Sequence, residues 1–359
     1  ALLSDGVWET LGQKAIHEAL QMYDSAQMVA DHLTKTALLQ GSQDNASALV
    51  VRIEDIGEDN LSDLLSIGKH LSPPPKLKVG DQLDGFEVLS LIHESRASLL
   101  YQVRNVQTGQ VSVMKTLQPL LAEDAESCQA LLNEEWLAKR VVSKYVPQVL
   151  PLNPEKRSKL YYMMSWHRGE TLQQLLDSGH HFTATQVAHI GTDLVRGLSA
   201  LHRLNILHRD IKPANIHIGD NKQLRILDLG VALSTGAASI SAMQNPGTPS
   251  FMAPELFDGN HASISSDIYA VGVTLYHLLT RRYPYGEIEP FQNPRFGEPV
   301  APTRYRPDIP HWLENILLKA VSRSPERRFE TSEEMMLALE HGELRPILPP
   351  ARTPLIARA

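Results

Sequence analysis

Apolar and polar positions divide the chain into parts with different periods. In residues 1–56, helical spacing of apolar residues runs through Ala19 and again from Ala26 to Leu39, and a β-rich run, ALVVRIE, follows. From about Val79 onward, three strand-like runs come first (FEVLSLI, SLLYQVRN and QVSVMKTL), and helical segments follow them. Because strands and helices do not alternate regularly, this pattern favours an α+β architecture over a doubly wound parallel sheet.

Two helices are predicted in the second part, one over LLNEEWLAKRVV and a long amphipathic one over residues 183–203. The stretch that precedes this second part contains SPPPK, and three consecutive prolines favour a semi-rigid extended linker. We therefore expect a first domain at 1–56, a linker at 57–78, a second domain at 79–342 and a tail at 343–359.

Composition narrows the possible partners. The 359 residues carry 34 Lys plus Arg and 41 Asp plus Glu, a net charge of −7, so no broad basic face for nucleic acid is expected. The single cysteine, Cys128, excludes an intrachain disulfide and any multi-cysteine zinc site. It fits a reducing compartment, and we expect a cytoplasmic protein.

The chain shows no segment long enough to span a membrane. Its best apolar stretch, Ile268 to Thr280, falls short of the roughly 18 residues that a bilayer requires. Since the chain opens on Ala1 without a Met, we expect a fragment of a longer protein. A membrane anchor would then lie beyond Ala359.

The strongest chemical signal is HRDIKPAN, residues 208–215, followed thirteen residues later by Asp228-Leu229-Gly230. Each piece alone could be a helix cap or a plain turn. Together, with this spacing, they resemble the bacterial members of the eukaryotic-type protein kinase superfamily over about residues 80–342. The resemblance implies a bilobal fold with an antiparallel sheet and a helix in the first lobe and a mostly helical second lobe. It also implies transfer of the ATP γ-phosphate to protein hydroxyls with Mg²⁺.

The resemblance assigns roles to the polar residues of these strings. Asp210 would orient the attacking hydroxyl, and Asn215 and Asp228 are hard oxygen donors suited to Mg²⁺. The segment between them, IHIGDNKQLRIL, is predicted to form a hairpin that brings both ligands to one end. Lys212, and Thr248 in GTPSFMAPE, indicate serine/threonine rather than tyrosine specificity.

Further roles are carried over on strand and helix positions. Lys115 in VSVMKTL would grip the α- and β-phosphates, paired with a glutamate of the next helix. Glu134 fits without a gap, but the adjacent Glu135 remains an alternative. Met164 to His167 would form the hinge that binds adenine, with Met164 as gatekeeper and Ser165 and His167 as contacts. Residues expected to brace the site are Glu255 paired with Arg328, and Asp267 on the catalytic loop.

The sequence departs from the family at the phosphate-binding loop. His93, Ser95 and Ser98 occupy the positions where three glycines are expected, and side chains there should widen the approach of backbone amides to phosphate. The hydroxyls of Ser95 and Ser98 are able to donate hydrogen bonds to phosphate instead. A pseudokinase that acts as a binding scaffold is therefore the alternative to an active enzyme.

Regulation by phosphorylation is predicted from Arg209, which directly precedes the catalytic aspartate and is able to pair with a phosphate. Self-association would allow autophosphorylation. Candidate acceptors in the activation segment are Ser234, Thr235, Ser239 and Ser241.

The amino-terminal piece resembles a different family. Ser4-Asp5-Gly6 and the later Asp44-Asn45, followed by ALVV, are similar to the carboxyl-terminal part of type 2C metal-dependent protein phosphatases. The resemblance implies a partial α/β domain in which Asp5 and Asp44 ligate Mg²⁺ or Mn²⁺ in a binuclear site. The alternative is that both aspartates lie in ordinary turns. The parent would be a bifunctional kinase and phosphatase, or a signalling protein dominated by phosphatase chemistry, while phosphatase activity of this fragment is not expected.

Overall fold

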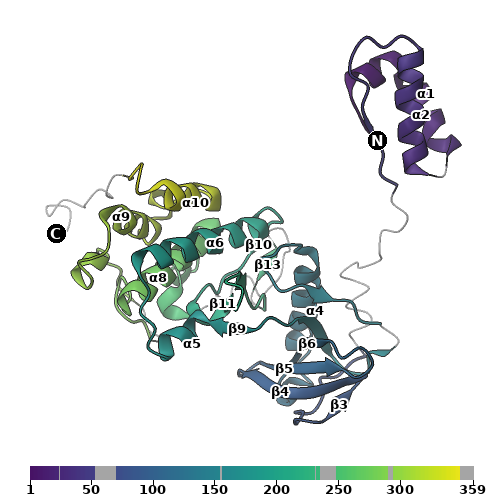
Figure 1. The fold of residues 1–359 in the computed structure, drawn as a ribbon. Coiled ribbons are helices and arrows are strands. Elements are labelled where there is room, and N and C mark those ends of the chain that lie inside the picture. The colour runs from purple at the N-terminus through teal and green to yellow at the C-terminus, as the bar shows by residue number, and fades with distance from the viewer. Residues whose placement is uncertain are drawn as a thin grey trace. The chain divides into compact units, whose positions relative to one another are not determined.

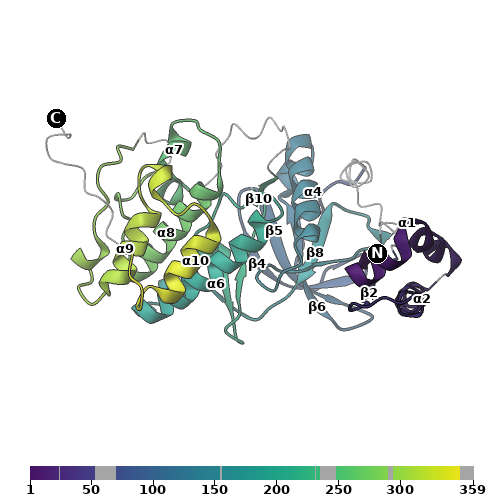
Figure 2. The same cartoon turned by 90° about the horizontal axis from the view of Figure 1, so that it is seen from above.

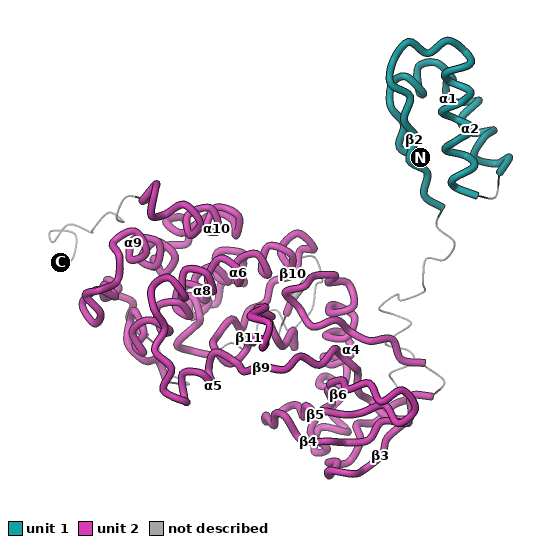
Figure 3. The backbone as a smooth tube through the Cα atoms, in the orientation of Figure 1, with its two compact units in different colours: residues 1–59 teal, residues 60–359 magenta. Residues whose placement is uncertain are grey.

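The protein forms two compact units, residues 1–59 and 60–359 (Figure 3). They are seen in a computed structural model that describes residues 1–23, 25–52, 70–153, 156–230, 232–234, 248–289 and 294–347. Each unit has its own hydrophobic core.

The first unit packs two helices beside a short antiparallel ribbon. Helix α1 spans Asp5–Met22 and α2 spans Ala26–Leu39, while strand β1 (Leu2–Leu3) pairs with β2 (Ala48–Leu49). The predicted helices are present, and Asp5 begins α1 instead of lying in a separate turn. The core consists of apolar residues at helical spacing: Val7, Ile16, Ala19, Val29, Leu33 and Ala37.

The second unit begins with a six-stranded antiparallel sheet in the order β3-β4-β5-β6-β8-β7. The three strand-like runs of the sequence form its centre, and helix α4 lies beside β6 (Figure 1). These elements form the first lobe: β3 Gln82–Leu83, β4 Phe86–Glu94, β5 Ser98–Asn105, β6 Val111–Leu117, α4 Ala125–Arg140, β7 Val149–Leu150 and β8 Tyr161–Ser165.

The second lobe is mostly helical (Figure 2). Its small strands β9, β11 and β12 form a three-stranded sheet of their own. The capping box at Thr183 begins α6 one residue inside the predicted range. The elements are β9 Gly169–Thr171, α5 Leu172–Asp177, α6 Ala184–His202, β10 Ile206–Leu207, β11 Ile216–Gly219, β12 Leu224–Ile226, β13 Leu233–Ser234, α7 Pro254–Phe257, α8 Ile264–Thr280, α9 His311–Ala320 and α10 Ser332–His341.

Part of the segment predicted as a linker packs on the second unit. Pro73 and Pro74 are buried, Leu71 contacts the main core, and Leu77 contacts the core of the sheet. The carbonyl of Ser72 accepts a hydrogen bond of 2.9 Å from the Leu160 amide. The prolines thus keep the extended form expected of them but do not act as a free spacer over residues 70–78.

Among the helices that the structure describes, none combines the length and apolar character needed to cross a bilayer.

Because residues 70–78 contribute buried apolar side chains, a chain that begins at Val79 should unfold at a lower temperature than one that begins at His70, both ending at Ile347. Burial of four apolar side chains stabilises by a few kcal/mol, and about 1 kcal/mol shifts the Tm of a domain this size by ~2–4 °C. We expect a difference of about 5–10 °C by calorimetry. Equal Tm values would show that the segment only tethers the two units.

Candidate active site

A buried lysine joins three parts of the second unit. Lys115, on β6, is 4% exposed, and its Nζ lies 2.6 Å from Oε1 of Glu134 on α4 and 2.6 Å from Oδ1 of Asp228. Asp228 follows β12, so one ammonium group links the sheet, the helix and the second lobe. Burial of charged groups is costly unless they are paired, and here every charge has an opposite partner.

The structure resolves the choice between the two adjacent glutamates. Glu135, also 3% exposed, pairs with Arg157 at 3.0 Å and with Lys139 at 3.4 Å. Neighbouring positions on a helix point about 100° apart, so the two carboxylates face different partners. Glu134 is the partner of Lys115.

The charges of this cluster shift each other's pKa. Lys115 lowers the pKa of Asp228 well below its usual range, so Asp228 is ionised at neutral pH. Burial raises the pKa of Glu134 to about 7 against the opposing effect of Lys115. Burial alone would lower the pKa of Lys115, but the carboxylates of Asp228 and Glu134 raise it above its usual range.

Sequence reasoning missed a second partner of Glu134. The hydroxyl of Tyr162, on β8, donates a hydrogen bond to the Glu134 carboxylate, and Tyr162 is 3% exposed. Tyr162 lies opposite Lys115 in the antiparallel register and two residues before Met164. Tyr162 could have been found from its position two residues before Met164, because residues two apart on a strand share a face.

A second polar cluster surrounds Asp210. Its Oδ2 lies 2.7 Å from Nζ of Lys212, and its Oδ1 accepts hydrogen bonds of 3.2 Å from both the amide and the hydroxyl of Thr248. Lys212 also donates to the Thr248 hydroxyl at 2.8 Å. The carboxylate is therefore oriented from two sides, by the loop that carries it and by the end of the activation segment.

The two predicted metal ligands flank the predicted hairpin, with Asn215 directly before β11 and Asp228 two residues after β12. The Asn215 amide nitrogen donates to Asp210 at 2.9 Å, which leaves its side-chain oxygen as the group that suits a metal. Leu227, next to Asp228, donates its amide to the Asn215 carbonyl at 2.8 Å. Asp228 keeps 47% of its side chain exposed, so a carboxylate and an amide oxygen are available together. This donor set fits Mg²⁺.

The loop that carries Asp210 is braced from helix α8, as predicted. The buried carboxylate of Asp267 accepts the amides of His208 and Arg209, each at 2.9 Å, and His202 at 2.9 Å. Arg209 has φ 70°, a left-handed conformation that costs energy for a residue with a side chain. Asp267 therefore holds a strained backbone in place immediately before Asp210.

The predicted pair of Glu255 and Arg328 is also present. Both carboxylate oxygens of Glu255 accept from the Arg328 guanidinium at 2.7 Å, and the Arg328 side chain is fully buried. Planar bidentate pairs of this kind fix orientation as well as distance. This pair anchors the end of the activation segment to the second lobe.

The phosphate-binding loop closes on itself. Ser95 accepts the amides of Ala97 and Ser98 on its hydroxyl, at 3.2 and 2.9 Å, and its own amide donates to the Ser98 carbonyl. His93 is an exposed residue of β4. The Ser95 hydroxyl thus accepts two amides within the turn and also donates to the Ser98 carbonyl at 3.3 Å. Its donation to phosphate remains a prediction.

The hinge residues comprise the last two residues of β8, Met164 and Ser165, and the two that follow it. Met164 pairs with Val113 and Val149 on the neighbouring strands and is partly buried. The Ser165 hydroxyl accepts the Gln148 amide at 3.0 Å and lies 2.9 Å from Nε2 of His167. Burial lowers the pKa of His167, which favours its neutral form.

The predicted phosphorylation sites are outside the described part of the chain. Thr235, Ser239 and Ser241 fall between residues 234 and 248, and for Ser234 only the backbone is described.

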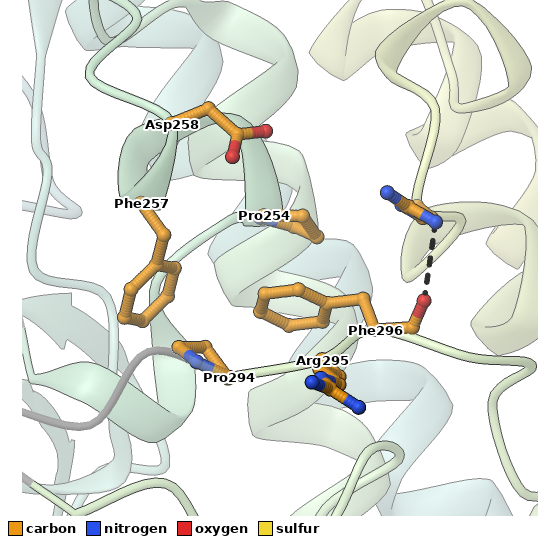
Figure 4. Close-up of a pocket in the computed structure, with 7 residues that line it drawn as sticks. Pro254, Phe257, Asp258, Pro294, Arg295 and Phe296 are labelled. Carbon is orange, nitrogen blue, oxygen red and sulfur yellow. Dashed lines mark hydrogen bonds between the residues drawn. The ribbon is translucent and has the colours of Figure 1, made fainter.

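A separate hollow of about 330 Å³ lies beside the end of the activation segment (Figure 4). The ring of Phe257 faces that of Phe296, with centroids 5.6 Å apart, and Arg323 donates to the Phe296 carbonyl. It contains none of the polar groups around Asp210 and Lys115. Its lining is Pro254, Phe257, Asp258, Pro294, Arg295, Phe296 and Arg323.

In the first unit, the start of α1, which carries Asp5, meets the loop that carries Asp44. The Ser4 hydroxyl donates to the Asn45 carbonyl at 2.6 Å, and a Cβ on Gly6 would come within 2.8 Å of the same oxygen. Both aspartates are exposed. Within the described ranges, however, no three His, Cys, Asp or Glu side chains gather where they could hold a metal ion.

Comparisons with solved structures agree with the bilobal fold. The kinase domain of Mycobacterium tuberculosis PknI covers 74% of this chain and 100% of its own length, with a TM-score of 0.57 and 23% identity. At this identity the similarity establishes the fold alone.

Comparisons of sequence define the family. The probable serine/threonine-protein kinase SCO3848 of Streptomyces coelicolor is 30% identical over 254 residues, 67% of this chain and 37% of that protein. Serine/threonine-protein kinase PrkC of Bacillus subtilis is 27% identical over 263 residues, 72% of this chain and 40% of that protein. The chain thus spans about two fifths of the length of these relatives. A family described as the protein kinase domain matches residues 86–336, more than half of the chain. The chain belongs to the protein kinase family.

Proposed function

We propose that this chain is a serine/threonine protein kinase that transfers the γ-phosphate of ATP to hydroxyl groups of proteins. The observation that carries the proposal is the pairing of two preformed clusters, Lys115 with Glu134 and Asp228, and Asp210 with Lys212 and Thr248. Catalysis of phosphoryl transfer depends mainly on positioning and on positive charge near the phosphates. Both requirements are met by the groups of these two clusters.

At the nucleotide end, Lys115 supplies a permanent positive charge for the α- and β-phosphates. Glu134 and Tyr162 keep the Lys115 side chain in one position, because both are buried and hydrogen-bonded in the same network. Asn215 and Asp228 would hold Mg²⁺, which neutralises phosphate charge when bound. When phosphate arrives, the Lys115 ammonium is already desolvated, so its attraction to phosphate is stronger than it would be in water.

At the acceptor end, Asp210 orients the attacking hydroxyl and accepts its proton as the new bond to phosphorus forms. Lys212 lies against the same carboxylate and places a second positive charge beside the transferred group. Thr248 bonds both residues and so closes the acceptor end of the site.

Serine/threonine specificity was predicted from Lys212 and from Thr248, and the contacts of both residues with Asp210 support it. The relatives SCO3848 and PrkC also carry the name of serine/threonine kinases. The alternative, a pseudokinase scaffold, depended on the glycine-poor loop. Because the loop is ordered by Ser95 while the charged clusters are complete, we favour the active enzyme.

Replacement of the proposed base tests this function. In an assay with labelled ATP and Mg²⁺, Asp210→Asn should reduce phosphate incorporation about a thousandfold, since a positioned general base contributes about 10²–10⁴ in rate. Mg·ADP should still bind, because Asp210 does not hold the nucleotide. The matched control is Asp220→Asn, an exposed aspartate of the β11–β12 turn.

Equal labelling by the wild type and Asp210→Asn would contradict the kinase proposal. No labelling together with no ADP binding by the wild type would favour the scaffold.

We propose in addition that residues 1–56 are the end of a type 2C phosphatase domain and that the parent protein is bifunctional. The contact between the start of α1, at Asp5, and the loop that carries Asp44 supports this relationship to the phosphatase family. Two carboxylates do not make a binuclear site, so the residues present do not fit that metal centre, and no phosphatase step is assigned to this chain.

Hydrolysis of p-nitrophenyl phosphate with Mn²⁺ tests the assignment. The wild-type chain should release phosphate no faster than the double variant Asp5→Asn, Asp44→Asn. Manganese-dependent hydrolysis lost in the double variant would show a working phosphatase site instead.

The cytoplasmic location, an anchor beyond Ala359, self-association and control by phosphorylation near Arg209 remain predictions from the sequence. Mass spectrometry of protein incubated with ATP would contradict the last of these if it found no phosphate between residues 231 and 248.

A further inference from the structure

The segment that precedes the sheet is attached to it on both sides of Lys76. The Lys159 ammonium donates to the Ser72 hydroxyl at 3.2 Å, and the Leu77 amide donates to the Tyr101 hydroxyl at 3.1 Å. The Leu77 side chain also contacts the core of the sheet. Because the chain around Lys76 is already ordered, less conformational entropy is lost when the lysine side chain forms an ion pair.

Lys76 makes an ion pair with the phosphate-binding loop. Its Nζ lies 2.7 Å from both carboxylate oxygens of Glu94, which ends β4 and directly precedes Ser95. The side chains of Lys76 and Glu94 are 51% and 42% exposed. An ion pair this exposed contributes little to stability when it stands alone. A larger role therefore depends on the groups that the pair connects.

Gln118 connects this ion pair to the backbone of the loop. Its side-chain amide donates to Oε1 of Glu94 at 3.2 Å and to the Ser95 carbonyl at 2.8 Å. Its backbone amide donates to the Ala97 carbonyl at 2.8 Å. Gln118 directly follows β6, the strand that carries Lys115. The loop and the ion pair are thus both bonded to the end of the strand that carries the buried lysine.

The register of the sheet shows how near this connection lies to Lys115. Strands β4, β5 and β6 lie side by side (Figure 1). Leu100 pairs with Lys115, and Ser98, at the end of the loop, pairs with Leu117. Two strand residues span about 7 Å. A displacement of the loop would therefore change the distance between its groups and the Lys115 ammonium, so that both could no longer bind the same phosphates in their best geometry.

We propose that Lys76, Glu94 and Gln118 are positioning residues of the phosphate-binding loop, through which the segment that joins the two units strengthens nucleotide binding. The inference rests on the proposed kinase function and goes beyond it, because it gives residues 70–78 a part in the reaction. The three residues act through the position of the loop, and none of them is assigned a contact with ATP.

Titration calorimetry with Mg·ADP on the full chain tests the proposal, with kcat for phosphate transfer measured beside it. Lys76→Ala should weaken ADP binding about three- to fivefold, the upper range for one exposed ion pair. Gln118→Ala removes both side-chain hydrogen bonds and should weaken binding about tenfold. In both variants kcat should stay within about twofold of the wild type, because the cluster around Asp210 is unchanged.

Three further variants separate positioning from a merely structural role. Lys76→Arg keeps the charge and should bind ADP within about 1.5-fold of the wild type. In a Glu94→Gln background, Lys76→Ala should add almost no further loss, because the lysine acts only through that carboxylate. The matched control is Arg104→Ala. Arg104 pairs with Glu87 at 2.8 Å at the other end of the same two strands, with side chains 48% and 31% exposed, and its loss should leave ADP binding unchanged.

Equal ADP affinities of the wild type, Lys76→Ala and Gln118→Ala would overturn the inference, and so would an equal loss in Arg104→Ala. If the wild type transferred labelled phosphate in either case, the proposed function would stand. A wild type that bound no ADP would overturn the inference and the proposed function together. A wild type that bound ADP without transferring phosphate would contradict the function alone.

Discussion

The structure of the second unit depends on the burial of one lysine between two carboxylates. Lys115 is held by Glu134 and Asp228 at 2.6 Å each, and these three residues come from the sheet, from helix α4 and from the strand pair of the second lobe. Removing Lys115 would leave the buried Glu134 carboxylate without its opposite charge, which is far more costly than the pair is stabilising. The cluster therefore fixes the relation between the lobes and positions the charge that phosphate requires.

In the phosphate-binding loop, hydrogen bonds hold a backbone that glycine residues would have left more flexible. The Ser95 hydroxyl holds two loop amides, and Gln118 donates to the Ser95 carbonyl at 2.8 Å and to Glu94 at 3.2 Å. Lys76 completes this network on Glu94, although that exposed pair adds little by itself. The loop is ordered before a nucleotide arrives, so less conformational entropy is lost on binding.

The sequence predicted the chemistry better than the geometry. The spacing of HRDIKPAN and Asp228 was enough to predict that Asp210, Asn215 and Asp228 lie close together, because one short loop and one hairpin carry them all. Glu134 and Glu135 could not be told apart, since the distinction depends on Arg157, which is distant in sequence. The local turn that engages the Ser95 hydroxyl could not be predicted, because such hydrogen bonds are not visible in a pattern of residue types. Burial of the prolines in SPPPK is likewise a property of the folded surface.

The adjacent glutamates provide the most direct test of the account. Kinetics of phosphate transfer by Glu134→Gln and Glu135→Gln compare two isosteric changes at equally buried neighbouring sites. The account predicts that Glu134→Gln lowers kcat/KM about 10- to 100-fold, a loss of ~1.4–2.8 kcal/mol of transition-state stabilisation, while Glu135→Gln stays within about threefold of the wild type. An equal loss in both variants, or a larger one in Glu135→Gln, would contradict the central role of the pair formed by Lys115 and Glu134.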